Sequence, residues 1–79
     1  MAMTDREKEW AGKMSRFIKA ELKRAGLGYK ELAAKLNEHG LQETEDSISA
    51  KLTRGTFAAT FFVAVLAVLG LGGVQLEDL

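Results

Sequence analysis

The chain has 79 residues, with 11 Lys and Arg, 11 Asp and Glu, one His, and neither Cys nor Pro. A chain of this length holds one domain, so we expect residues 1–79 to form a single unit, with residues 1–4 as a disordered segment or a cloning remnant. The lack of Cys excludes a disulfide framework and a Cys-based metal site. We therefore expect no enzyme, no catalytic or metal-ligating residue, no cofactor and no small-molecule ligand.

The balanced total charge hides an uneven distribution along the chain. Residues 1–35 carry nine bases and five acids, whereas residues 36–50 carry four acids and no base. No charged residue lies between Gly55 and Gln75. The basic first part permits a phosphate-bearing partner, and the acidic segment opposes one because duplex DNA is densely negative.

The first predicted helix covers residues 5–25. Its apolar residues recur at helical spacing and form one stripe: Trp10, Met14, Phe17, Ile18 and Leu22. We expect this stripe, Trp10 included, to face the core, and Gly26 to end the helix. The basic residues on the other faces of this helix are either a phosphate-facing patch or a solvated surface, and the spacing leaves both open.

Two shorter helices follow. The second is predicted over residues 29–38 and ends before Gly40. The third starts near Thr44, a favourable N-cap residue followed by acids in the first turn, and it ends at Gly55. Ile48 and Leu52, four residues apart, are its apolar contacts.

The fourth predicted helix, residues 57–69, is apolar on every side and is therefore expected at the centre of the fold. It spans about 20 Å, less than the ~30 Å hydrocarbon core of a bilayer, so we expect no membrane span and a cytoplasmic protein. Residues 74–79 alternate like a short strand but equally permit a short helix.

A chain this small cannot cover all the apolar side chains of the last helix by itself. An uncovered remainder marks a self-association surface. We therefore expect a homodimer, with an interface formed by Phe61, Val65, Val68 and Leu76.

Several short motifs occur in a characteristic order. They are Leu32-Ala33, Ile48-Ser49, Gly55 at the end of the third helix, and residues 66–70 at the end of the fourth. In this order they resemble the lambda-repressor/Cro-type helix-turn-helix family, most closely a small uncharacterised bacterial branch of it. The resemblance implies an all-α, compact four- to five-helix bundle with a helix-turn-helix, in which residues 37–43 lengthen the turn between the second and third helices.

The resemblance also implies a function. It implies that the protein is a small DNA-binding domain, and that it acts as a dimeric transcriptional regulator with double-stranded DNA as its partner. By the same resemblance, the residues that contact DNA are Lys30, Thr44, Ser47, Lys51 and Arg54. The acids near the third helix leave an alternative open: a protein-interaction or dimerisation module on the same fold that does not bind DNA.

Overall fold

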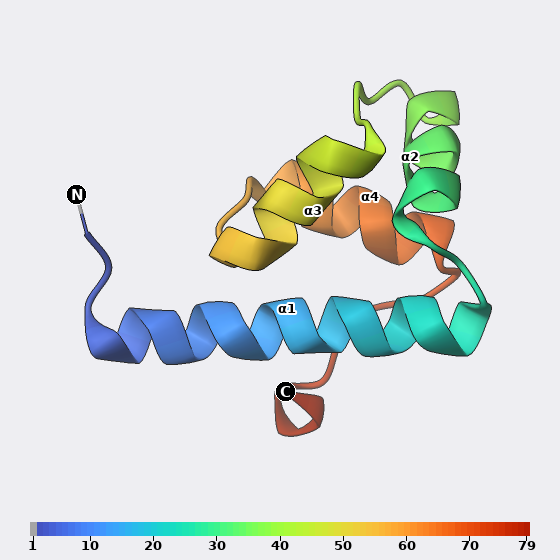
Figure 1. The fold of residues 1–79 in the computed structure, drawn as a ribbon. Helices are drawn as coiled ribbons and strands as arrows, with labels where there is room; N and C mark the ends of the chain where they lie inside the picture. Colours follow the sequence, from blue (N-terminus) through green and yellow to red (C-terminus); the bar gives the residue numbers. More distant parts are fainter. Residues whose placement is uncertain (1) are drawn as a thin grey trace.

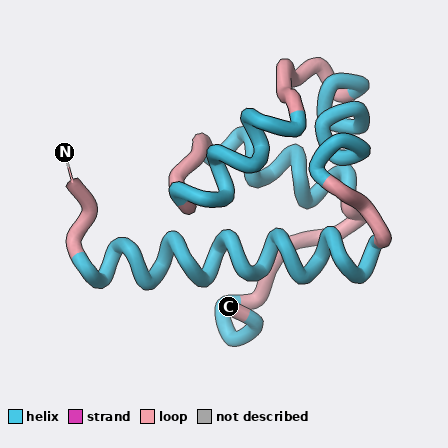
Figure 2. The backbone as a smooth tube through the Cα atoms, in the orientation of Figure 1, coloured by secondary structure: helices cyan, strands magenta, loops and turns pink. Residues whose placement is uncertain are grey.

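The structure, a computed structural model, describes residues 2–79, and the prediction made for Met1 lies outside these residues. The chain forms four α-helices and one short 3₁₀ turn, and residues 2–79 contain no strand (Figures 1 and 2). The all-helical prediction is confirmed. The elements are α1 (Asp5–Ala25), α2 (Tyr29–Glu38), α3 (Glu45–Arg54), α4 (Ala59–Val68) and η1 (Leu76–Asp78).

The long helix α1 lies along one side of the other three helices, which gather over it (Figure 1). Helix α2 packs against α3 and α4, and α1 packs against α3. One apolar core joins all four helices, and its members are Ile18, Leu22, Leu32, Ala33, Leu36, Ile48, Leu52, Phe61 and Val65. The apolar residues predicted for the first and third helices contribute to it through Ile18, Leu22, Ile48 and Leu52.

Helix α1 begins at a capping box formed by Thr4 and Glu7. The Thr4 hydroxyl accepts the Glu7 backbone N–H at 3.1 Å, and the Thr4 backbone N–H donates to the Glu7 carboxylate at 2.9 Å. Hydrogen bonds from the backbone and side chain of Thr4 hold the pKa of Glu7 below its ordinary value of 4.5. The contribution of this charged cap to stability is therefore fully present above pH 4.5. It is lost as the pH falls through the lowered pKa of Glu7. Thr4, one of the residues expected to be a disordered segment or a cloning remnant, is thus the N-cap of α1.

Helix α4 differs from its prediction in length and in position. It runs from Ala59 to Val68, and Phe57 lies before it and packs its ring against Phe61, with ring centres 5.2 Å apart. Only Phe61 and Val65 of α4 are fully buried, and Val63 on another face is 62% exposed. Helix α4 therefore buries one face in the core and leaves the other uncovered, so its own chain does not enclose it on every side; the uncovered face is the apolar remainder expected on the last helix.

Two residues expected at a dimer interface occupy the core instead. Phe61 and Val65 are packed against the chain's own helices and have almost no accessible surface, so in this conformation they cannot contact a second copy. Val68 is partly buried at the edge of the core, and Leu76 is 72% exposed. Of the four residues expected at the dimer interface, only Val68 and Leu76 therefore have surface that a second copy can contact.

The first helix contains a second correction. Trp10 is 57% exposed rather than buried. Trp10 lies outside the core and borders an apolar hollow with Phe57 and Phe62. The Lys13 ammonium lies over the Trp10 ring, 4.9 Å from its centre.

The end of the chain adopts the helical alternative. Residues Leu76–Asp78 form a 3₁₀ turn, so the strand alternative for residues 74–79 is wrong. No single helix among residues 2–79 is long and apolar enough to cross a membrane, although α3 and α4 together have that length and composition and are bent by 117°.

Gly55 determines how closely α1 and α3 approach. It ends α3 with a left-handed backbone (φ 71°), and a Cβ placed on it would lie 2.7 Å from the Ala11 Cβ and 2.9 Å from the Ala11 carbonyl oxygen. Gly26 has nearly the same backbone angle (φ 70°) but no neighbouring atom within 4 Å of such a Cβ. The two glycines therefore separate the cost of the backbone from the cost of crowding.

We expect Gly55→Ala to lower the free energy of unfolding by roughly 2–4 kcal/mol, because it adds a clash with α1 to the left-handed strain. Gly26→Ala carries only the backbone strain, about 1 kcal/mol. Urea denaturation followed by circular dichroism measures both. Equal losses in the two variants would contradict the close approach at Gly55.

Candidate nucleic-acid interface

Helix α3 buries only one narrow face against the rest of the domain. Ile48 and Leu52 are its buried residues, and the remaining positions of its surface are exposed or partly so: Glu45, Asp46, Ser47, Ser49, Ala50, Lys51, Thr53 and Arg54. Its first turn is closed by a second capping box. The Thr44 hydroxyl accepts the Ser47 backbone N–H at 3.0 Å, and the Ser47 hydroxyl accepts the Thr44 backbone N–H at 2.8 Å.

The connection between α2 and α3 is stabilised by hydrogen bonds from one side chain, that of Asn37. The Asn37 amide donates to the Glu43 carbonyl oxygen at 3.0 Å and accepts the Glu43 backbone N–H at 2.8 Å. This pair of bonds joins the end of α2 to the start of α3. It also fixes the backbone of Glu43 beside α3.

The Glu43 carboxylate binds two of the residues expected to contact DNA. Its side chain is only 7% exposed. It accepts the Ser47 hydroxyl at 2.6 Å and the Lys51 ammonium at 2.7 and 2.8 Å. The Lys51 ammonium also lies over the Phe61 ring, 5.2 Å from its centre, and its side chain is 25% exposed. Lys51 and Ser47 thus both bind Glu43 within the protein, and the pairing of Lys51 with an acid eight residues earlier was not predicted.

Lys30 and Arg54, the other two cations expected at DNA, are exposed, and the part of the chain that the structure describes offers neither an ion-pair partner. They lie far apart. Lys30 follows the C-terminal end of α1, whereas Arg54 precedes Gly55, which contacts Ala11 near the other end. Along α1 this separation is roughly 20 Å, so the two cations cannot bind the same phosphate.

A hollow of about 440 Å³ lies where α1 passes the end of α3. We call it the basic hollow, because its charged lining residues are Lys8, Arg16, Lys19 and Arg54, and no acid lines it. None of the four has an ion-pair partner within residues 2–79. Lys8, Arg16 and Lys19 were not among the residues predicted to contact DNA. Their spacing could have predicted that they lie together, because positions i, i+8 and i+11 share one helix face.

Ser15 and Gly12 form part of the floor of the basic hollow. The buried Ser15 hydroxyl donates to the Leu52 carbonyl oxygen at 2.7 Å and joins α1 to the last turns of α3. Gly12 leaves the helix backbone bare, and the Arg16 guanidinium lies over it, with Nη1 3.1 Å from where a Cβ would stand.

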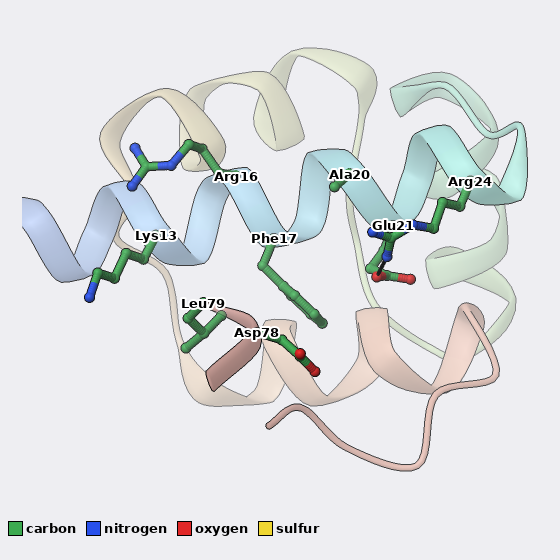
Figure 3. Close-up of a pocket in the computed structure, with 8 residues that line it drawn as sticks. All are labelled: Lys13, Arg16, Phe17, Ala20, Glu21, Arg24, Asp78 and Leu79. Atoms are coloured by element: carbon green, nitrogen blue, oxygen red, sulfur yellow. Dashed lines mark hydrogen bonds and ion pairs between the residues drawn. The ribbon is translucent and has the colours of Figure 1, made fainter. Parts of the chain in front are cut away.

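A second hollow lies on another side of α1, against the C-terminal segment (Figure 3). Arg16, which in this view leaves α1 on the side away from Phe17 and Asp78, lines both this hollow and the basic hollow. Acids and bases both line this hollow, and Glu21 forms an ion pair with Arg24. Its mixed charge distinguishes it from the basic hollow.

A third hollow, of about 510 Å³, is mainly apolar. Trp10 and Met14 of α1 line it together with Phe57 and Phe62, which flank the start of α4. Phe62 also connects it to the uncovered face of α4, since Phe62 lies next to the exposed Val63.

These features define a small all-helical domain with an exposed third helix and a basic hollow beside it. A family model described as "Domain of unknown function (DUF6471)" matches residues 10–74, and the chain belongs to this family. No curated protein matches the chain, and no solved structure matches it. The matched residues include all of α2, α3 and α4 and most of α1, and they exclude Lys8 and η1.

We expect Ser15→Ala to lower the free energy of unfolding by about 1–3 kcal/mol, because it leaves the buried Leu52 carbonyl without its hydroxyl donor. Ser49→Ala, on the exposed surface of α3, is the matched control and should change stability by no more than ~0.5 kcal/mol. Thermal and urea unfolding measure the difference. Similar effects at the two positions would show that the Ser15 bond does not hold α1 on α3.

Proposed function

We propose that this chain is a small DNA-binding helix-turn-helix domain that acts as a dimeric transcriptional regulator. The observation that carries the proposal is the outer surface of α3. This helix buries only Ile48 and Leu52, and it ends in the exposed Arg54, which has no ion-pair partner among residues 2–79. In a helix-turn-helix, the second helix of the pair enters the major groove. An Arg on that helix donates to phosphate oxygens or to the acceptor edge of guanine.

The five proposed contact residues have different roles in this proposal. Arg54 and Lys30 are free to bind phosphate directly. Thr44 and Ser47 fix the start of α3 through their capping box. Lys51 reaches DNA only when it leaves the Glu43 carboxylate, so Glu43 opposes binding both by its own charge and by holding a cation.

The dimer contact in this proposal uses the uncovered face of α4 and the C-terminal segment. Val63 and Leu76 are large exposed apolar residues, and Val68 lies at the edge of the core. Domains of this type commonly read paired half-sites as two-fold dimers. An uncharged face is compatible with a second copy of itself, because no like charges meet across the two-fold axis.

Binding of a random-sequence duplex, followed by fluorescence anisotropy over a range of salt concentrations, tests the proposal. We expect Arg54→Ala to weaken binding about tenfold, with a salt dependence lower by about one ion if Arg54 binds phosphate. Lys35→Ala removes the same charge from the exposed surface of α2 and should change affinity little. If the unchanged protein does not bind duplex at low salt, the proposal is wrong.

Glu43→Gln provides an independent prediction. It keeps the shape of the side chain but removes its charge, so Lys51 is released and a repulsive carboxylate disappears. We expect duplex affinity to rise several-fold and to depend more steeply on salt. Glu38→Gln, an exposed acid of α2, makes the same change in net charge and serves as the control. An equal gain in both variants would mean that only total charge matters.

A protein-interaction or dimerisation module without DNA binding is the second candidate. The apolar hollow around the exposed Trp10 favours it, since apolar patches of this kind mark protein contacts. Analytical ultracentrifugation combined with the duplex assay separates the two candidates. Self-association without duplex binding at low salt supports the interaction module.

A further inference from the structure

We propose that the basic hollow binds the phosphate backbone of duplex DNA between α1 and the end of α3. This inference rests on the proposed function and deepens it. It assigns a phosphate-binding role to Lys8, Arg16 and Lys19 of α1, which the helix-turn-helix resemblance does not include. In this arrangement α1 holds the DNA backbone while α3 lies at the groove.

The first argument is charge. Four cations line one hollow, and no acid lies among its lining residues. Each of the other two hollows includes at least one carboxylate, Glu7 in the apolar hollow and Glu21 in the hollow of Figure 3. Like charges held together repel one another, and no ion pair among residues 2–79 offsets that repulsion. A phosphate in the hollow would turn the repulsion into attraction.

The second argument is the shape of the floor. Gly12 is in the interior of α1, where glycine is less favourable than alanine. The Arg16 guanidinium takes the space that the missing side chain leaves, with Nη1 3.1 Å from where a Cβ would stand, so Gly12 lets this cation lie close to the α1 backbone at the floor of the hollow. The Ser15 bond to Leu52 and the contact of Gly55 with Ala11 hold the two helices at a fixed distance.

The third argument concerns the kind of anion. Lys8, Arg16, Lys19 and Arg54 are all exposed, as is typical of side chains that follow a nucleic-acid backbone rather than enclose a small ion. Arg54 belongs both to the hollow and to the outer surface of α3. A duplex lying on that surface therefore brings its backbone past the hollow.

The test compares two double variants of the full chain in the random-duplex assay. Lys8→Ala/Lys19→Ala removes two cations of the hollow, and Lys23→Ala/Lys35→Ala removes two exposed cations that do not line it. We expect the first to lower affinity at least tenfold, equally for all sequences, and to reduce the salt dependence by about two ions. We expect its melting temperature to be unchanged or higher, because repulsion within the hollow is relieved.

The outcomes separate this inference from the proposed function. If the unchanged protein binds duplex and the two double variants bind equally well, the hollow does not hold a phosphate and the proposed function stands. If the unchanged protein binds no duplex at low salt, both are wrong. Phosphatidylserine vesicles provide the other arm: binding to vesicles that the first double variant loses, with duplex binding kept, would assign the hollow to a membrane surface and overturn the inference.

Discussion

The close approach of α1 to the end of α3 is the contact on which the rest of the structure depends. A glycine makes it possible at Gly55, and a buried hydroxyl bond from Ser15 fixes it a short distance along α1. Without this contact α1 would lose its attachment near its N-terminal half, since the start of the helix extends past the other three (Figure 1). The basic hollow exists only because these two helices are held side by side.

The ends of the helices were predictable because local chemistry determines them. Thr44 with its first-turn acids marks the start of α3, and glycines with left-handed backbones follow α1 and α3. Residue types and spacing therefore gave the bounds of the first three helices correctly. The bounds of α4 were less predictable, because neither end has a side-chain cap and Phe57 is apolar whether or not it is helical.

Burial and pairing depend on contacts between distant residues, and there the sequence was a weaker guide. Trp10 shares the apolar stripe of α1, yet it stays 57% exposed and lines an apolar hollow with Phe57 and Phe62. Lys51 has the charge and position of a DNA contact, yet a carboxylate eight residues earlier holds it. The basic residues of α1 were recognised as a patch or a solvated surface. Only their relation to Arg54 across two helices distinguishes four of the cations from the rest.

The two hydrogen bonds between Asn37 and the Glu43 backbone have a consequence for how this domain can diversify. Because of them, the acid that pairs with α3, Glu43, belongs to the connecting loop and not to the helix itself. A single replacement at position 43 changes the charge beside Lys51 while every residue of α3, including its two core contacts, stays the same. The loop is thus a place where the electrostatic character of the α3 surface can be changed without replacing any residue of α3.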